Sequence, residues 1–370
     1  MLYIHHTTCI SPQPADLIGG GGAFAPATRE DHASVGESAL AAGEDRVSLA
    51  GPVDGVYKVV EPAYPGIPPG TLRRMSKAVR LGVGAAMPLI RQGRIDGILI
   101  GTGNGGMEES VKFLRQIVDY AEGMLAPGHF VQSIPNAIAS QIGLSRHLRG
   151  YNSTYVHRGL GFEHALIDAS MLISENAGSR YLVGGVDEVS GYHYRIEAAD
   201  GWYKPSVQPG RTLYDYDSPG SIAGEGAALF LVGGEPADAL AALRGIETFH
   251  STDPRSVTTR LQAFLDQHLP AGLRPALLLS GENGDNRALP FYAAAESVLD
   301  PAAPLARYKH LCGEYPTASA FAVWLALQLD VTLPSHLVKK AGIINEMQYI
   351  LLYNNHKLMQ HSFILLERYR

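Results

Sequence analysis

Short apolar runs alternate with longer amphipathic segments along most of the chain, and this alternation restricts the possible folds more than any other feature. Apolar and β-branched runs, which are typical of buried strands, occupy residues 97–100, 181–183, 227–232 and 276–279. Helical patterns occupy residues 72–93, 107–123, 135–147, 161–176, 255–268, 287–299 and 315–328. The alternation predicts α/β layers with mostly parallel strands.

The composition changes near residues 233–240, where Gly, Glu, Pro and Asp interrupt the apolar pattern before the alternation starts again. We therefore expect two halves, residues 1–235 with loop insertions and residues 236–370. The Gly-rich residues 19–28 and the Pro- and Gly-rich residues 61–70 are expected to be surface loops or mobile lids.

The charge balance and the hydropathy argue against several classes of partner. The 370 residues carry a formal net charge of −6, whereas contacts with nucleic-acid phosphates need a basic footprint. No stretch approaches the roughly 18 apolar residues that span a membrane, and no secretory pattern opens the chain. We expect no nucleic-acid or membrane partner and a cytoplasmic location. The basic cluster at residues 73–80 is either a solvated helix start or a contact for an anion or an acidic partner.

Cysteines and glycines give little support for a metal or a cofactor. Cys9 and Cys312 are too few for a disulfide framework or a metal cluster, and Cys9 lies in an apolar strand, where we expect a core residue. Residues 101–106 (GTGNGG) fit the G-x-G-x-x-G pattern between a strand and a helix. However, no acidic residue ends a following strand about 20 positions later. A tight strand-to-helix turn needs the same glycines, so we expect no nucleotide cofactor.

Five segments occur in the order in which one enzyme family carries them. They are residues 74–77 (RMSK), 101–106 (GTGNGG), 135–142 (PNAIASQI), 183–188 (VGGVDE) and 214–227 (YDYDSPGSIAGEGA). The last segment contains Glu225, a carboxylate that precedes an apolar strand and needs buried partners. With these segments the chain resembles the β-ketoacyl-ACP synthase branch of the thiolase-fold enzymes. The resemblance implies two similar βαβαβ halves in a layered αβαβα arrangement.

Condensing members of that family use a cysteine at the start of a buried helix and two histidines. The resemblance places Gly159 at the cysteine position, within residues 153–169. Slips of one or two residues give Arg158, Leu160, His157 or Gly161. Glu282 stands at the first histidine position, and Glu314 stands at the second, after a retained Lys309. No register supplies a cysteine or a serine, so the Cys-His-His triad is absent.

A glutamate is a poor substitute for either histidine, because a carboxylate donates no hydrogen bond to a thioester oxyanion and repels a malonyl carboxylate. We expect Glu282, Glu314 and Lys309, with Arg158 as a further candidate, to form an ion-pair network that fills the vestigial site. This network requires the two glutamates to lie within about 8 Å of each other.

Other residues near this site have two interpretations each. Cys312 is either a reactive thiol or a core residue. His157 and His164 are either a displaced acid/base pair or structural histidines. Residues 192–195 (YHYR) are expected in a loop at a subunit contact or a pocket rim.

Two functions from different classes are compatible with this pattern. The first is a non-catalytic partner similar to the chain-length-factor subunits of type II polyketide systems. Such a chain would pair with an active ketosynthase or with itself, through a strand near residues 153–157, and would meet acyl carrier protein. The alternative is an active acyltransferase or 3-oxoacyl-ACP synthase that uses Cys312, His157 or a glutamate base. Fatty-acid, polyketide or pigment polyene biosynthesis is the context by analogy.

Overall fold

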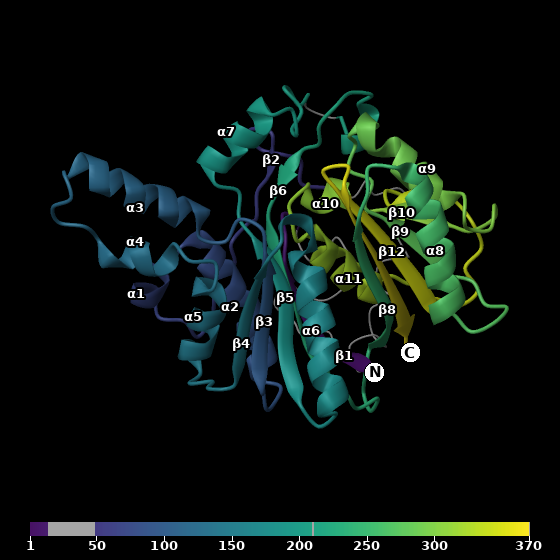
Figure 1. Ribbon diagram of the computed structural model, residues 1–370, viewed down its shortest axis with the longest axis horizontal. Helices are drawn as coiled ribbons and strands as arrows, with labels where there is room; N and C mark the ends of the chain where they lie inside the picture. Colours follow the sequence, from purple (N-terminus) through teal and green to yellow (C-terminus); the bar gives the residue numbers. More distant parts are fainter. Residues whose placement is uncertain (14–48, 209–210, 370) are drawn as a thin grey trace, which may run out of the picture.

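The computed structural model describes residues 1–13, 49–208 and 211–369, and this part of the chain forms one large mixed sheet covered by helices (Figure 1). The sheet has 11 strands in the order β11-β10-β9-β12-β13-β8-β1-β7-β5-β3-β4. The strands are β1 (Leu2–Ile10), β3 (Gly97–Thr102), β4 (Tyr151–Val156), β5 (Arg180–Asp187), β7 (Gly226–Gly233), β8 (Ala241–His250), β9 (Leu277–Ser280), β10 (Leu305–Arg307), β11 (Val338–Lys340), β12 (Tyr349–His356) and β13 (Gln360–Arg368). A second, two-stranded sheet pairs β2 (Val56–Tyr57) with β6 (Ala223–Gly224).

The strands of the two expected halves occupy the two sides of the large sheet. They meet where β1 pairs antiparallel with β8, with Leu2 opposite Leu243. The boundary expected at residues 235–236 falls in the connection between β7 and β8. Strand β4 lies at one edge of the sheet and β11 at the other.

The prediction of mostly parallel strands is wrong. In the large sheet of the described residues, the parallel pairs are β3 with β4 and β5, and β9 with β10 and β12. The pairs that involve β1, β7, β8 or β13 are antiparallel. The reason is that β12 and β13 form a hairpin and that β7, although far from β5 in sequence, returns against the direction of β5.

The helices form layers on both sides of the strands and between them, which confirms the expected layered α/β arrangement. Helices α2 (Lys77–Ile90) and α5 (Ala137–Ser145) cover the outer face of the first set of strands. Helices α8 (Pro254–His268) and α9 (Leu289–Glu296) cover the outer face of the second set. Helices α6 (Gly161–Glu175) and α11 (Ala318–Gln328) pack in the central core with strands of both sets. Almost every residue of α11 is buried, as expected for a helix that is apolar on all sides.

The remaining helical elements are short, apart from α3. They are α1 (Pro69–Leu72), α3 (Met107–Asp119), α4 (Pro127–Gln132), α7 (Gly191–Ala199), α10 (Lys309–Cys312), η3 (Arg158–Leu160), η4 (Leu213–Asp215) and η5 (Asn286–Ala288). In Figure 1, α3 and α4 project from the body of the molecule on the side of α5.

Two expectations about local structure need correction or fall outside the description. Residues 192–195 lie in helix α7 and not in a loop, because Ser190 caps the helix by accepting a hydrogen bond from the His193 N–H at 3.1 Å. The Gly-rich residues 19–28 lie outside the described residues. Within the described part of the chain, no helix is both long enough and apolar enough to cross a bilayer.

Candidate functional site

The turn between β4 and α6 has the backbone geometry of a nucleophile position but not the chemistry. Arg158 has a φ of 49°, which is uncommon for a residue other than glycine. A strained residue between a strand and a helix start is a common way to present a nucleophile to backbone N–H groups. Here that residue is an exposed arginine, followed by the buried Gly159 and Leu160. The geometry therefore favours Arg158 over Gly159 as the turn position, and neither is a nucleophile.

Two side chains from the β12–β13 hairpin occupy the space in front of Gly159. Its backbone N–H donates to the Gln360 Oε1 at 3.0 Å, so this amide already has a partner. A Cβ placed on Gly159 would lie 2.2 Å from the Cβ of His356. Any side chain at position 159, a cysteine included, would therefore require His356 to move.

A buried ion pair lies beside His356. The Glu314 Oε1 lies 3.0 Å from the Lys309 Nζ and 3.6 Å from the His356 Nδ1, and its Oε2 accepts a hydrogen bond from the Asn283 Nδ2 at 2.9 Å. Lys309 is 0% exposed and Glu314 8% exposed. Burial raises the pKa of Glu314, but Lys309, His356 and Asn283 outweigh it and lower the pKa to about 2. Glu314 is thus an ionised acceptor with its partners already in place.

Glu282 does not share this network, which corrects the expected arrangement. Its Oε1 accepts a hydrogen bond from the Arg307 Nη1 at 2.9 Å, and its Oε2 lies 2.5 Å from the Lys339 Nζ. Arg158 joins neither group of charges in the described part of the chain. In the segment that follows β9, Asn283, one residue later, is the one that contacts Glu314. The geometry therefore favours Asn283 over Glu282 as the residue that faces Glu314.

Three histidines gather next to the same turn. The ring centroids of His157 and His164 are 4.6 Å apart, and those of His157 and His250 are 5.6 Å apart. Burial, and then the neighbouring His157 and His250, lower the pKa of His164. The His250 Nε2 also lies 3.2 Å from the Gln360 Nε2. The cluster packs beside the start of α6, which favours the structural interpretation of His157 and His164 over an acid/base pair aimed at a substrate.

Neither cysteine has the environment of a reactive thiol. Cys312 is 0% exposed, and burial raises its pKa, an effect that the nearby Lys309 only partly offsets. Its Sγ lies 3.3 Å from the carbonyl oxygen of Gly313. Burial also raises the pKa of Cys9, which lies in β1 as expected. Of the two interpretations of Cys312, the structure favours the core residue.

The Gly-rich turn at residues 101–106 is held by a protein carboxylate. The Asp187 Oδ1 accepts hydrogen bonds from the N–H groups of Gly103 and Asn104, both at 2.9 Å, and from the Thr102 hydroxyl at 3.0 Å. Its Oδ2 accepts hydrogen bonds from the N–H and the hydroxyl of Thr317. These glycines allow close backbone packing, because a Cβ at position 101 would meet the backbone of Phe162 and one at 103 would meet Pro316.

Glu225 joins three segments, as its buried position predicts. It accepts hydrogen bonds from the N–H groups of Val59 at 2.9 Å and Val189 at 3.1 Å, and it pairs with Lys77 at the start of α2. The neighbouring Glu188 accepts a hydrogen bond from the Ala78 N–H at 3.1 Å. Burial raises the pKa of Glu188 to about 7. No group of residues suited to a metal ion was found in the described part of the chain.

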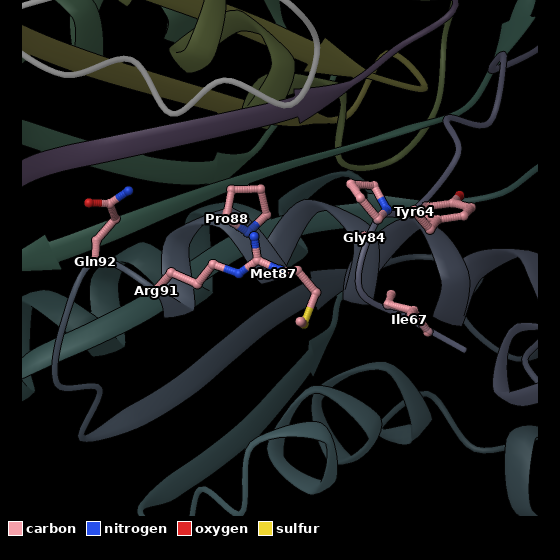
Figure 2. Close-up of a pocket in the computed structure, with 8 residues that line it drawn as sticks. Tyr64, Ile67, Gly84, Met87, Pro88, Arg91 and Gln92 are labelled. Carbon is pink, nitrogen blue, oxygen red and sulfur yellow. The ribbon is translucent and has the colours of Figure 1, made fainter. Parts of the chain in front are cut away.

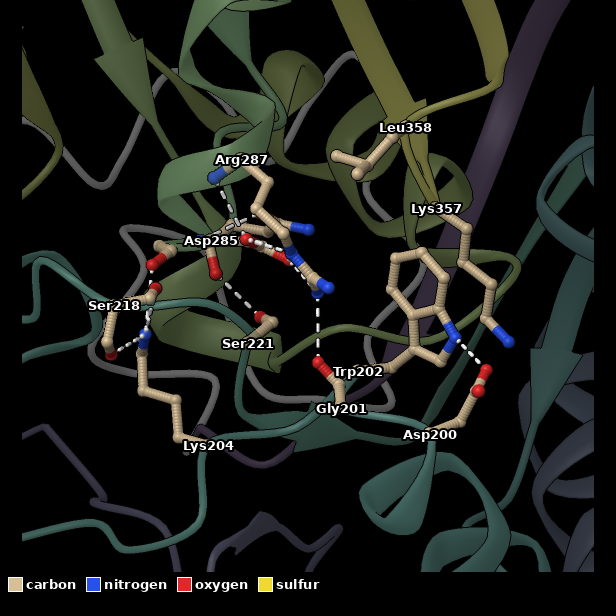
Figure 3. Close-up of polar contacts among 12 residues, drawn as sticks. Asp200, Gly201, Trp202, Lys204, Ser218, Ser221, Asp285, Arg287, Lys357 and Leu358 are labelled. Atoms are coloured by element: carbon tan, nitrogen blue, oxygen red, sulfur yellow. Dashed lines mark hydrogen bonds and ion pairs between the residues drawn. The ribbon is translucent and has the colours of Figure 1, made fainter. Parts of the chain in front are cut away.

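The tip of the β12–β13 hairpin is attached to α7 and to the segment that follows it, and Figure 3 shows Lys357 beside Trp202 of that segment. Lys357 and Leu358 have φ values of 51° and 62°, as in a tight hairpin turn. The Lys357 Nζ pairs with Glu197 and lies 5.2 Å from the ring centroid of Trp202. On the other side, Arg287 lies 4.7 Å from the same ring. The hairpin that carries His356 is thus held over the turn at Arg158 and Gly159.

Sequence reasoning missed Asn283, His356 and Gln360 as members of this site. The resemblance to the ketosynthase family implies a Gly/Phe-rich loop where this chain has residues 354–359 (NNHKLM), and this difference was the available signal for His356. Nothing in the local pattern marks Gln360, because its contact with Gly159 crosses 201 positions of sequence.

Comparisons with known proteins support the interpretation of the fold. Residues 50–203 match the family described as beta-ketoacyl synthase, N-terminal domain. The curated 3-oxoacyl-[acyl-carrier-protein] synthase 2 of Rhizobium meliloti (strain 1021) is 27% identical over 142 residues, which are 37% of this chain. The alignment spans only 34% of that relative's length.

Two solved structures match over almost their full length. The ishigamide ketosynthase/chain length factor has a TM-score of 0.70 and 18% identity, with 100% of this chain and 99% of that chain covered. The complex of the ketosynthase ApeO with its chain length factor ApeC, from Xenorhabdus doucetiae, gives a TM-score of 0.71 and 16% identity, with coverage of 100% and 98%.

These solved structures show that the chain shares the layered α/β fold of ketosynthases and chain length factors. The expected resemblance to the β-ketoacyl-ACP synthases is confirmed by the match of residues 50–203 and by the curated relative. The assignment of Gly159, Glu282 and Glu314 to family positions remains a prediction.

Proposed function

We propose that this chain is a non-condensing partner of an active ketosynthase, in the manner of a chain length factor. The observation that carries the proposal is the filled turn at the start of α6. Arg158 and Gly159 supply no nucleophile, the Gly159 amide donates to Gln360, and the Cβ of His356 occupies the space a side chain at 159 would need. Acyl transfer needs a nucleophile and free N–H groups for the oxyanion, and this turn offers no nucleophile and a Gly159 N–H that already has a partner.

The charges around the turn support the same conclusion. Glu314 is ionised and already accepts from Lys309 and Asn283, so it has no proton to donate to a thioester oxygen. Its negative charge would repel the carboxylate of a malonyl group placed at the same point. The arrangement stabilises a filled site and opposes malonyl decarboxylation.

Strand β4 is the surface we propose for the partner. It lies at an edge of the large sheet, so one side of its backbone is open to a further strand. Its ends also expose apolar side chains, because Tyr151 is 43% exposed and Val156 52% exposed. Pairing of β4 with the matching strand of a ketosynthase, or of a second copy, would cover both features. The acyl group would be delivered to that ketosynthase by acyl carrier protein.

The test is a condensation assay with malonyl-loaded acyl carrier protein. It is run on three samples: this chain alone, a ketosynthase from the same genome alone, and the two proteins co-expressed. We expect activity only in the mixture, and we expect it to disappear when the cysteine of the ketosynthase is replaced by alanine. Turnover by this chain alone would instead support an acyltransferase or synthase with atypical residues. The burial of Cys312 and the filled turn both weigh against that alternative.

A further inference from the structure

Two adjoining cavities lie on the outer side of α2, away from the turn at Gly159. The first, shown in Figure 2, has a volume of about 200 Å³, and the second has a volume of about 310 Å³. They share Ile67 and Met87 as lining residues, so they form one groove between the loop that precedes α1, helix α2 and helix α5. Together they reach the lower range of small-molecule sites, which is roughly 300–1,000 Å³.

The wall formed by the loop is held in place by specific contacts. Arg80 donates hydrogen bonds to both oxygens of Glu61, at 2.7 and 2.6 Å, and the Tyr64 hydroxyl donates to the same carboxylate at 2.9 Å. Tyr64 has a φ of 50°, and its ring fills the notch left by Gly84, where a Cβ would lie 2.3 Å from the ring. A bulky residue keeps such a backbone only where its surroundings hold it. The groove is therefore a preformed feature of the fold.

The lining of the groove combines apolar side chains with uncharged polar ones and one arginine for each cavity, and the first cavity is the more apolar of the two. Ile67, Met87 and Pro88 line the first cavity beside Arg91, and Leu144 lines the second beside Arg146. Of the described residues that line either cavity, none is acidic. In the described part of the chain, neither arginine has an ion-pair partner, and both are exposed.

Arg91 is the residue best placed to meet a ligand. Its guanidinium lies against Gly66, where an added Cβ would be 2.9 Å from Nη2, and Figure 2 shows the side chain running past Pro88 toward Met87. A guanidinium binds a carboxylate through two parallel hydrogen bonds, and the apolar side chains of Ile67, Met87 and Pro88 next to it favour an alkyl chain. These two features favour a ligand with an anionic head and an apolar tail.

We propose that this groove is a binding site for a straight-chain alkyl carboxylate, with the carboxylate on Arg91 and the alkyl chain along Ile67 and Met87 toward the second cavity. The site shares no residue with the turn at Arg158 and Gly159, so the inference does not depend on the proposed partner role. Neither cavity is lined by a residue of β4.

Titration calorimetry of the full chain with dodecanoate and with dodecanol tests the proposal. We expect dodecanoate to bind with one site per chain and dodecanol to bind at least about tenfold more weakly, because the alcohol cannot form the charge-assisted pair. Arg91→Gln should weaken dodecanoate binding by about tenfold and leave dodecanol binding unchanged. Arg149→Gln, which removes an exposed arginine that lines neither cavity, is the matched control and should have no effect.

Filling the groove provides a second, independent test. Ile67→Trp should abolish the binding of both ligands, and Leu144→Trp, at a side chain that is 68% exposed, should weaken it without risk to the core. Equal affinity for dodecanoate and dodecanol, equal loss with the Arg149 variant, or no binding to the native chain would each overturn the proposal.

Discussion

The backbone N–H of Gly159 donates a hydrogen bond to the side chain of Gln360 at 3.0 Å, across 201 positions of sequence. The Nε2 of the same Gln360 side chain lies 3.4 Å from the His157 carbonyl oxygen. One glutamine from the start of β13 therefore closes the turn that opens α6. In an acyl-transfer site, a backbone N–H group at such a turn is free to bind an oxyanion. Here the Gly159 N–H is already bonded to the Gln360 side chain.

Packing between Gly159 and His356 predicts a strong dependence of one position on the other. Gly159→Ala should lower the free energy of unfolding by about 2–3 kcal/mol, because its Cβ would overlap the Cβ of His356. In a His356→Gly background the same change should cost less than about 1 kcal/mol. Urea denaturation of the four proteins of this cycle measures the coupling. Equal costs in both backgrounds would show that His356 does not limit the space at position 159.

The same packing bears on activity. Gly159→Cys should give no condensation when the chain is assayed alone with malonyl-loaded acyl carrier protein. A cysteine in that place would overlap His356, whose Nδ1 lies 3.6 Å from the ionised Glu314. Gain of turnover with the single cysteine would contradict the proposal that the whole site is filled.

The buried pair of Lys309 and Glu314 should matter far more than an exposed pair. Lys309→Met should destabilise the chain by about 3–5 kcal/mol, because it leaves a buried carboxylate without its cation. Arg260→Met, which breaks an exposed pair with Glu247, is the control and should cost less than about 1 kcal/mol.

The pH dependence of that pair follows from the pKa of Glu314. The folded value, about 2, is lower than that of a glutamate in the unfolded chain. This carboxylate therefore stabilises the fold above about pH 4.3, and its contribution disappears as the pH falls toward 2. Glu314→Gln should remove that part of the acid dependence, as measured by urea unfolding between pH 5 and pH 3. An unchanged acid profile in the variant would contradict the assignment.

Glu188 should have the opposite pH dependence. Burial raises its pKa to about 7, so the folded chain keeps the proton over a range in which the unfolded chain has released it. The contribution of Glu188 to the free energy of unfolding is fully present below about pH 4.3. Between about pH 4.3 and pH 7 it decreases by on the order of 3 kcal/mol. Glu188→Gln should therefore become more stable than the native chain at pH 8, with a much smaller difference at pH 4. Glu235→Gln, at an exposed position, should show no such trend.

Association through β4 can be tested with a single charge. Val156→Glu places a carboxylate on the exposed end of this edge strand and should weaken assembly with the ketosynthase or with a second copy. Val331→Glu, at a side chain that is 40% exposed far from β4 in sequence, is the control. Sedimentation velocity measures both. Equal association of the two variants would exclude β4 as the interface.

The helices were more predictable than the strand pairing. The expected ranges for α3, α6 and α8 agree with the structure to within a few residues, because the 3.6-residue period is a local property. The direction of neighbouring strands was predicted wrongly, since it depends on how β7 and β13 return across the sheet. Helix α7 was also not predicted, because its residues show only a weak apolar pattern. In the structure, the Ser190 side chain caps its first turn.

The residue order alone establishes the α/β class, the ketosynthase-like motifs and the lack of a cysteine or serine near residue 159, because these depend on composition and local spacing. The folded chain establishes that Glu282 pairs with Arg307 and Lys339 while Asn283 contacts Glu314. Glu282 and Asn283 are neighbours just after the end of β9, so a choice between them is a choice between two environments. That choice rests on contacts between residues far apart in the sequence, and only the packed sheet brings them together.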